Sequence, residues 1–363
     1  MRVGLVMIVK DEEAVLERAL RSALPWITTW VIVDTGSTDG TRGLVRRVLA
    51  DIPGILFDRT WVNFGANRTE ALQLCRGRMD WAIMLDADDE LAGPVPPPAV
   101  FTDALDGLRM RIQHGSLWHQ RIQLFRIAAD WSYKGAVHEF PVCRSGAPRI
   151  GILPAESYMI TRCEGARSRD PQKYTKDAAI LEAALVENPG DSRTLFYLAQ
   201  SYRDAGNREE ARRVYGAYLD LSEGVGWNQE RYMAIVNLIG LEDDSQDQMD
   251  LAWKAVELCP DRLEAPYTLL RRRRLEGRPV LRQTYALASV CRNRKVAADW
   301  LFATPAVYEW GMDDELAVVA FALGHYQEAY DAAMRCVLNG PAETRENAMR
   351  NARAALNKMQ GLP

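Results

Sequence analysis

The spacing of apolar residues changes about halfway along the chain, and this change constrains the fold more than any other feature. In the first half, apolar runs rich in Val and Ile alternate with amphipathic stretches of helical period. The runs cover 3–9, 30–33, 54–57 and 81–85, and the helical stretches lie around 12–24, up to 50, and around 69–75. Short apolar runs separated by helices are typical of a parallel sheet covered on both faces. We therefore predict an α/β domain with a mostly parallel sheet.

Further strands are predicted at 122–126, 136–143 and 158–162, with a proline-rich loop at 93–98. After about Gly165 only helical spacing remains. Small and aromatic residues there follow the pattern of a helical repeat: Leu195, Leu198, Ala199, Tyr202, Gly206, Ala211 and Tyr215, then Leu316, Ala317, Ala320, Gly324, Ala329 and Ala333, with a weaker copy around Leu269, Leu270 and Gly277. The pattern resembles tetratricopeptide repeats, and a generic helical bundle is the alternative.

Length and charge set outer limits on what the chain can be. At roughly 150 residues per domain, 363 residues suggest two domains, which we place at 1–166 and 167–363. A net charge of −4 argues against a protein that mainly coats nucleic acid or an anionic membrane. The apolar run at 3–9 is followed by charged residues, so we interpret it as a strand and not as a signal peptide. The six cysteines lie far apart, which favours reduced thiols in a cytoplasmic protein.

Acidic residues follow three of the predicted strands. The clusters are Asp11 and Glu12 after the first run, Asp34 and Asp39 around the second, and Asp86, Asp88 and Asp89 after the fourth. Ligands of open α/β sheets bind at the carboxyl ends of the strands. Crowded carboxylates repel one another unless a cation shares the site, and aspartates with a divalent metal can hold a phosphate. The pattern therefore predicts a metal-bridged diphosphate at this edge.

Two common nucleotide sites lack their sequence motifs. No G-x-G-x-x-G follows the first strand and no G-x-x-x-x-G-K-[ST] occurs, so neither a Rossmann dinucleotide site nor a P-loop is expected. Gly36 and Gly40 bracket a tight turn, in which Ser37 or Thr38 is expected to cap the next helix. Asp34 is harder to explain structurally, because an acid at a strand end can bind a base or a ribose.

Five segments carry a resemblance to a known family. VKDEE at 9–13, VIVDTGSTDGT at 31–41 and LDADD at 85–89 look like family 2 of the glycosyltransferases, which have the GT-A fold. WVNFGANR at 61–68 and WSYKGAVHE at 131–139 resemble motifs of a subgroup whose transferase domain is fused to tetratricopeptide-like helices. The resemblance covers roughly the first 165 residues, and 258–262 and 308–316 look similar to the helical part of that subgroup.

The resemblance implies a role for each matching residue. The donor nucleotide, UDP in the first instance, is expected to contact Asp11, Glu12, Asp34 and Ser37. In the D-x-D segment, Asp88 is expected to bind Mg²⁺ or Mn²⁺, and Asp86 the ribose or the metal. Arg68 is expected to contact the diphosphate, with an exposed helix arginine as the alternative.

Inversion at the sugar carbon requires a general base on the face opposite the leaving group. Many members of the family use an Asp in an E-D dipeptide, which this chain lacks at the corresponding place. We expect Glu139 to be the base, with Asp89 as the second candidate. His138 is then expected to bind the metal or the diphosphate. The alternative is a His–Glu pair on a solvated loop.

Two further groups of residues have structural alternatives. Trp118, Trp131 and Tyr133 can stack on sugars of the acceptor or pack in the core. The run of four arginines at 271–274 is expected to be a solvated helix face, since consecutive helical residues point in different directions. If the acceptor were an acidic polymer, this arginine run would be the candidate binding site.

Together these features predict an inverting, metal-dependent glycosyltransferase that moves a sugar from a nucleotide-sugar donor. The acceptor, a protein, a glycan or a modified nucleic acid, would be presented partly by the helical domain, which could also form a homodimer. One alternative is a nucleotide-binding scaffold with an inactive transferase-like domain. Another is a nucleotidyltransferase, which would release pyrophosphate.

Overall fold

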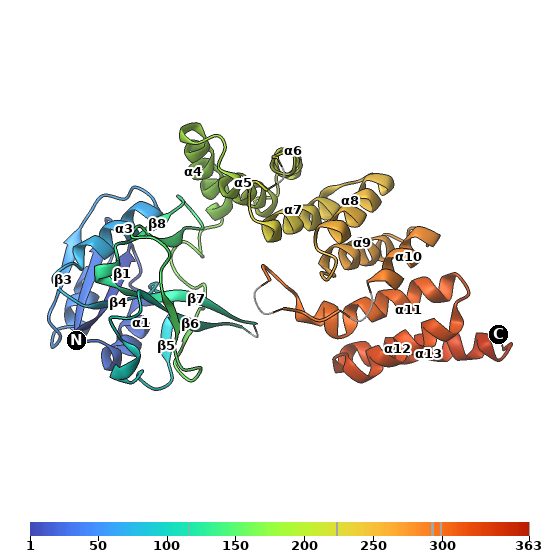
Figure 1. Cartoon of the computed structure of the whole chain (residues 1–363), viewed down its shortest axis with the longest axis horizontal. Coiled ribbons are helices and arrows are strands. Elements are labelled where there is room, and N and C mark those ends of the chain that lie inside the picture. The colour runs from blue at the N-terminus through green and yellow to red at the C-terminus, as the bar shows by residue number, and fades with distance from the viewer. Residues whose placement is uncertain (116, 223, 292–293, 298–299, 363) are drawn as a thin grey trace. The chain divides into compact units, whose positions relative to one another are not determined.

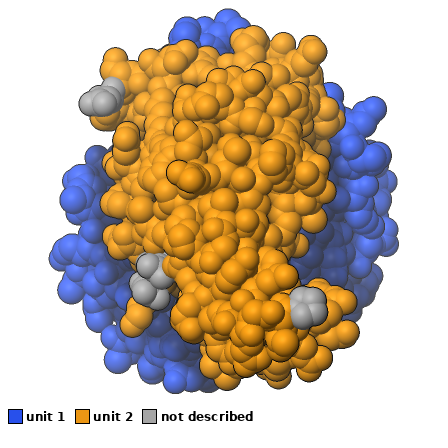
Figure 2. Space-filling view, turned by 90° about the vertical axis from the view of Figure 1, so that its right-hand side faces the viewer, with its two compact units in different colours: residues 1–189 blue, residues 190–363 orange. Residues whose placement is uncertain are grey.

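The computed structural model describes residues 1–115, 117–222, 224–291, 294–297 and 300–362. They form two compact units, Met1–Pro189 and Gly190–Pro363, which Figure 2 colours separately. Strands occur in the first unit only, among the described residues, and the second is helical. The predicted fold class, an α/β domain followed by helices, is confirmed.

The first unit is built on a mixed sheet with the strand order β3-β2-β1-β4-β7-β6-β11-β5 and β10 beside β6 (Figure 1). Its first half is parallel and consists of β1 (Val3–Val9), β2 (Thr29–Asp34), β3 (Gly54–Asp58) and β4 (Trp81–Met84). The second half is mixed and consists of β5 (Glu90–Ala92), β6 (Gly107–His114), β7 (Leu117–Arg126), β10 (Ile150–Ile152) and β11 (Tyr158–Ile160). A separate hairpin pairs β8 (Trp131–Lys134) with β9 (Phe140–Cys143).

Helices cover both faces of the parallel strands, which explains why β1 is buried along its whole length. On one face, α1 (Leu16–Ala23) and α2 (Thr41–Val48) pack on Leu5, Met7 and Ile32. On the other face, α3 (Phe64–Leu74) packs on Val6 and Val31. Because both faces of such strands are buried, their sequences do not alternate between apolar and polar residues.

The strands β5, β6, β8 and β10 were not predicted from the sequence, and one predicted strand has different bounds in the structure. Strand β6 was not predicted, although its apolar residues alternate in the manner of a half-buried strand, with Met110 and Ile112 buried and Arg109 exposed. The predicted strand at 136–143 is wrong in its first half, because the chain bends there, with φ of 102° at Gly135 and 55° at His138. Strand β9 begins only at Phe140, so His138 and Glu139 precede a strand and do not end one.

The helix α4 (Lys173–Glu187) belongs to the first compact unit. The last strand ends at Ile160, so strands give way to helices near the expected position at 166/167, while the division into compact units falls after Pro189. The domain limits 1–166 and 167–363 stay a prediction.

The second unit consists of α5 (Ser192–Asp204), α6 (Arg208–Leu219), α7 (Asn228–Leu241), α8 (Ser245–Leu258), α9 (Glu264–Leu275), α10 (Arg282–Val290), α11 (Met312–Ala322), α12 (Tyr326–Asn339) and α13 (Ala342–Met359). In the two clearer repeat copies, the glycine lies in the tight turn between paired helices, with φ of 80° at Gly206 and 82° at Gly324. Left-handed backbone of this kind favours glycine. The small residues Ala199, Ala211 and Ala320 are buried where helices meet, as in tetratricopeptide-like pairs.

The four arginines at 271–274 are not a solvated helix face, and that interpretation is wrong. Arg273 is buried, and Arg274 forms ion pairs with Asp314 and Glu315 at 2.8 Å. Arg271 lies 3.7 Å from Glu315. Arg272 donates to the carbonyl oxygen of Ile239 at 2.7 Å. The run therefore joins neighbouring helices.

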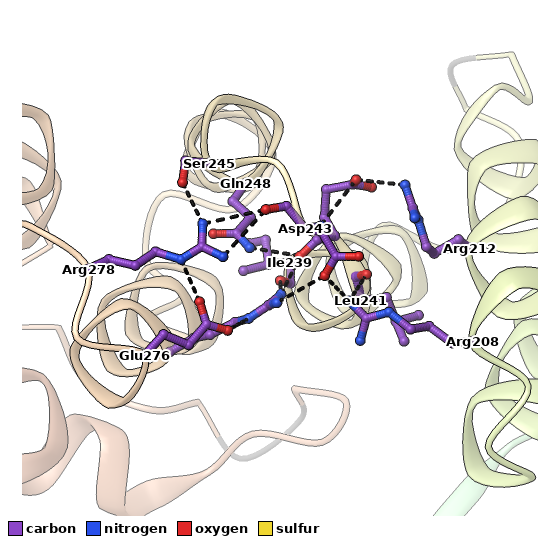
Figure 3. A network of polar contacts seen from close by, with 11 residues as sticks. Arg208, Arg212, Ile239, Leu241, Asp243, Ser245, Gln248, Glu276 and Arg278 are labelled. Carbon is purple, nitrogen blue, oxygen red and sulfur yellow. Dashed lines mark hydrogen bonds and ion pairs between the residues drawn. The ribbon is translucent and has the colours of Figure 1, made fainter.

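A polar network holds the turn between α7 and α8 (Figure 3). Arg208 binds Asp243, Arg212 binds Glu242 and Arg278 donates to the carbonyl oxygen of Asp243, while Arg272 reaches the last carbonyls of α7. Cations beside a helix C-terminus satisfy its unpaired carbonyls and its dipole. We interpret this network as structural.

Within the described ranges, no helix is both long and apolar enough to span a membrane.

Candidate functional site

The acidic clusters lie at one edge of the sheet, because β2, β1 and β4 are adjacent and parallel. Asp34 ends β2 and is paired with Val9 at the end of β1. Asp11 follows β1, and its carboxylate accepts hydrogen bonds from the Thr38 N–H at 2.7 Å and from the Thr38 hydroxyl at 3.1 Å. The Asp11 N–H donates to Ser37 Oγ at 3.0 Å. These hydrogen bonds hold Asp11 and the turn after β2 against each other.

Asp34 is fully buried, and only one of its oxygens is used. Its Oδ1 accepts hydrogen bonds from the N–H groups of Gly36, at 3.0 Å, and Ser37, at 2.9 Å. Its Oδ2 makes no hydrogen bond within the part of the chain that the structure describes. A buried acceptor without a partner is costly, so this oxygen requires a functional or a structural reason.

The expectation that Ser37 or Thr38 caps α2 is wrong. The N-cap residue is Gly40, and it is Asp39 whose Oδ1 accepts from the N–H of Thr41 at 3.0 Å. Ser37 and Thr38 instead bind Asp11 across the turn, which brings the ends of β1 and β2 together.

A segment that the sequence analysis did not single out closes over Glu12 and Asp88. We call residues 161–170 the strap. The Gly165 N–H donates to Asp88 Oδ2 at 2.8 Å, and the Ala166 N–H donates to Glu12 Oε2 at 2.9 Å. Burial raises the pKa of Glu12 to about 7, although the Ala166 hydrogen bond acts against this, and the charge of Asp88 raises it further. The strap thus supplies donors to two carboxylates that lie close together.

Arg68 bridges two of the candidate residues. Its guanidinium lies 2.5 Å from Asp86 Oδ1 and 2.7 Å from Glu139 Oε1, and it stands 5.8 Å from the centre of the Tyr133 ring. Burial would raise the pKa of Asp86, but the charges of Arg68 and Arg121 hold it below its ordinary value. Arg68 is therefore not an exposed helix arginine, and it connects the D-x-D segment with the WSYKGAVHE segment.

The WVNFGANR segment explains how Arg68 is placed. Asn63 caps α3 by accepting from the Ala66 N–H at 2.8 Å, and the buried Asn67 accepts from the N–H of Val62 at 2.9 Å. A β-carbon at Gly65 would lie 2.2 Å from the carbonyl oxygen of Gly135, so only glycine permits this approach of α3 to the end of β8. The motif residues thus hold the helix against the loop that carries Glu139.

Asp89 is 1% exposed, and its Oδ2 has no hydrogen-bond partner among the described residues. Burial and the neighbouring Asp86 raise its pKa to about 8. A carboxyl group in this environment holds its proton at neutral pH. Asp89 is therefore a poor proton acceptor in this structure.

His138 lies in an exposed bend beside Glu139. Over the described part of the chain, no group of three or more His, Cys, Asp or Glu side chains is arranged to hold a metal ion. Asp86, Asp88 and His138 are thus not assembled as a ready three-ligand cage. Mg²⁺ is commonly held by one or two carboxylates together with substrate phosphates, and Asp86 and Asp88 fit that mode of binding.

The aromatic candidates separate into different environments. Trp131 is buried, and its indole N–H donates to the carbonyl oxygen of Asp106 at 2.8 Å, so its role is in the core. Trp118 is 44% exposed and packs between Tyr158 and Arg111. Tyr133 lies beside Arg68.

Sequence reasoning missed the strap and Arg121, and it gave Thr38 a capping role where the structure shows a contact with Asp11. Arg121 lies on β7, and its charge acts on Asp86 and Asp89. Finding it would have required the antiparallel pairing of β7 with β4, for which no local sequence signal exists.

Comparison with known proteins identifies relatives of both parts of the chain. Residues 5–100 match the family model described as Glycosyl transferase family 2. A TPR repeat-containing protein of Synechococcus elongatus is 31% identical over 229 residues, which cover 58% of this chain and 55% of that protein. The chain thus spans about half the length of this curated relative.

Two solved structures are similar at low identity. S. aureus TarS 1–349, in complex with UDP-GlcNAc, is 14% identical with a TM-score of 0.41, over 78% of this chain and 95% of that chain. TTC0263, a thermophilic TPR protein of Thermus thermophilus, is 18% identical with a TM-score of 0.30, over 51% of this chain and 91% of that chain. At these identities and TM-scores, neither likeness assigns a property to this chain.

Proposed function

Because this chain carries a glycosyl transferase family 2 domain at its N-terminus, followed by a TPR-like helical region, we propose that it transfers a sugar from a UDP-sugar to an acceptor hydroxyl with inversion. The observation that carries the proposal is the meeting of Asp11, Asp34 and the D-x-D residues at the carboxyl edge of three adjacent strands. This is the edge at which open α/β sheets bind ligands.

The donor nucleotide is assigned to the end of β2. The unused Oδ2 of Asp34 is an acceptor for an N–H group of the base or a hydroxyl of the ribose. Asp34 is fully buried, so the nucleotide must open the turn at Gly36 and Ser37 to reach it. Gly36 has a φ of 105° and no atom within 4 Å of a β-carbon position, which leaves room at this turn.

A divalent cation is assigned to Asp88 and Asp86. One oxygen of Asp88 is held by the Gly165 N–H, and the other makes no hydrogen bond among the described residues. Oriented carboxylates of this kind are common metal ligands. When bound, Mg²⁺ or Mn²⁺ would neutralise charge that develops on the leaving diphosphate. His138 is retained as a candidate ligand for the metal or the diphosphate.

Glu139 is assigned as the general base. In the transfer step, the acceptor oxygen forms a bond to the anomeric carbon, the bond from that carbon to the β-phosphate oxygen breaks with its electron pair, and the hydroxyl proton moves to Glu139. The environment of Asp89 disfavours it for this role, because its carboxyl is buried and holds a proton. Arg68 keeps Glu139 close to Asp86 through its two ion pairs.

The experiment is a screen of UDP-sugars with Mn²⁺, in which released UDP is measured for the wild type, Asp88→Asn and Asp103→Asn. We expect Asp88→Asn to lose about two orders of magnitude of turnover. Asp103→Asn changes an exposed loop aspartate and should keep the wild-type rate. Equal rates in Asp88→Asn and the wild type would contradict the metal assignment.

Glu139→Gln tests the base separately. We expect it to bind UDP and to lose transfer by roughly 10²- to 10⁴-fold. Full transfer by this variant would move the base elsewhere. Release of pyrophosphate would indicate nucleotidyl transfer, and no turnover of any donor, with or without metal, would favour the scaffold with an inactive transferase-like domain.

A further inference from the structure

Arg18 on α1 holds the strap against the sheet. Its guanidinium lies 2.7 Å from Glu164 Oε2 of the strap and 3.5 Å from Glu90 Oε2 of β5. A second strap residue, Arg162, lies 3.0 Å from the same Glu90 oxygen. Two arginines and two carboxylates thus form one network, which fixes the part of the strap that precedes Gly165.

The contact between the strap and Asp88 follows this network directly in the chain. Gly165 is the next residue after Glu164, and its N–H is the one hydrogen-bond partner of the Asp88 carboxylate among the described residues. A β-carbon at Gly165 would lie 3.3 Å from Asp88 Oδ2 and 3.3 Å from Glu12 Oε1, so a glycine lets the backbone pass close to both carboxylates. A displacement of Glu164 would therefore move the donor that holds Asp88.

The other end of the strap is anchored independently of Arg18. Arg167 forms an ion pair with the buried Asp177 of α4, and its guanidinium stands 4.4 Å from the centre of the Phe64 ring. The strap would stay attached at this end if Arg18 were replaced. We therefore expect the loss of Arg18 to loosen the part of the strap that faces Asp88 without detaching the whole segment.

The contacts of Arg18 set the size of the effect on a bound metal. A protein group that hydrogen-bonds a metal ligand orients it, and its loss lowers metal affinity about 10- to 100-fold. Arg18 acts on the Gly165 hydrogen bond indirectly, through two partly exposed ion pairs. Each such pair shifts an equilibrium by up to about fivefold, so we expect an effect of about threefold to twentyfold on metal affinity.

We propose that Arg18 is a positioning residue for the metal site. It holds the strap through Glu164 and Glu90, so that the Gly165 N–H fixes one oxygen of Asp88 and the other oxygen faces the cation. The proposal rests on the proposed function, since it assumes a divalent cation at Asp88. It assigns a part in metal binding to a residue that lies outside the acidic clusters.

The test is a titration of the full chain with Mn²⁺, without and with UDP, in which free Mn²⁺ is measured by electron paramagnetic resonance. Arg18→Gln should raise the dissociation constant of Mn²⁺ about threefold to twentyfold. Arg18→Lys should restore part of the affinity, because a lysine keeps the charge without the planar fork. Arg21→Gln is the matched control and should bind Mn²⁺ as the wild type does, since Arg21 pairs with Glu17 of the same helix.

Glu164→Gln removes the other side of the ion pair. It should also weaken Mn²⁺ binding, and the double variant Arg18→Gln/Glu164→Gln should lose less affinity than the product of the two single losses, because both changes remove the same contact. Hydrogen exchange of peptides from the strap, measured without metal, should be faster in both single variants than in Arg21→Gln.

The outcomes separate this proposal from the proposed function. Equal Mn²⁺ affinity in Arg18→Gln and the wild type would overturn the role of Arg18 alone, whatever the exchange of the strap shows. Tighter Mn²⁺ binding by Arg18→Gln would also overturn it, because the strap would then obstruct the cation. Unchanged exchange of the strap in Arg18→Gln would show that Arg18 does not hold this segment. A wild type that binds no Mn²⁺, with or without UDP, would refute the metal assignment of the proposed function, and the role of Arg18 with it.

Discussion

Replacement of Arg68 by methionine is the sharpest test of how the site is held together. The Arg68 side chain is 11% exposed, Glu139 is 12% exposed and Asp86 is 38% exposed. A hydrogen bond to a charged group in a buried setting contributes about 1.5–3 kcal/mol, whereas a solvent-screened ion pair contributes under about 1 kcal/mol. We therefore expect Arg68→Met to reduce the free energy of unfolding by roughly 2–4 kcal/mol at pH 7, because it removes the hydrogen bond to Asp86 and leaves the largely buried Glu139 without its ion-pair partner.

The loss should depend on pH in a defined direction. The pKa of Asp86 lies below its ordinary value in the folded chain, so its contribution to stability is present above the unfolded pKa and is lost as the pH falls through the folded one. The difference between wild type and Arg68→Met should thus be largest near neutral pH and should shrink toward pH 3. The two compact units can unfold separately, so the free energy is measured by hydrogen exchange of peptides from α3.

A double-mutant cycle isolates the contact. Arg68→Met, Glu139→Gln and the double variant should give a coupling free energy of at least about 1 kcal/mol. Arg76→Met is the matched control, because Arg76 pairs with Asp130 at an exposed position near the end of α3 and should cost less than about 1 kcal/mol. A zero coupling energy, or equal losses in Arg68→Met and Arg76→Met, would refute the assignment of Arg68 as the bridge.

Two further predictions concern stability. Glu315 is 1% exposed, and burial raises its pKa to about 7. The folded chain therefore holds this proton more tightly than the unfolded chain does. As the pH rises from about 4.5 to 7, the free energy of unfolding should fall by up to about 3 kcal/mol. Urea unfolding of Glu315→Gln should lack this loss, and parallel pH curves for the two proteins would contradict the interpretation. Gly65→Ala would place a β-carbon 2.2 Å from the Gly135 carbonyl oxygen and should destabilise the first unit by about 1–3 kcal/mol. The control is Gly43→Ala in α2, where nothing lies within 4 Å of the added β-carbon. We expect this control to gain about 0.5–1 kcal/mol in the free energy of unfolding, measured by thermal unfolding. A Gly65→Ala variant as stable as the wild type would show that the two backbones do not meet.

Local pattern was sufficient for the four parallel strands, for the change to helices after them and for the edge on which the carboxylates gather. The four parallel strands and their helices follow from short apolar runs, which are buried in β1, β2 and β4. An aspartate after a parallel strand reaches the same edge whatever the rest of the fold does. The turn glycines Gly206 and Gly324 likewise mark helix pairs, because their backbone conformation is a local property. For this reason the fold class, an α/β domain followed by repeated helix pairs, could be predicted from the sequence.

The partners of the charged residues depended on contacts between segments far apart in the chain. Arg68 faces Glu139 because Gly65 lets α3 approach the end of β8. The strap reaches Glu12 across more than 150 residues of chain. Spacing along a sequence specifies which face a side chain takes, but strand register and close backbone approaches arise only when distant segments pack together. The sequence alone thus determined the parallel strands, the helical second half and the acidic edge, and the tertiary structure decided which charges are paired there.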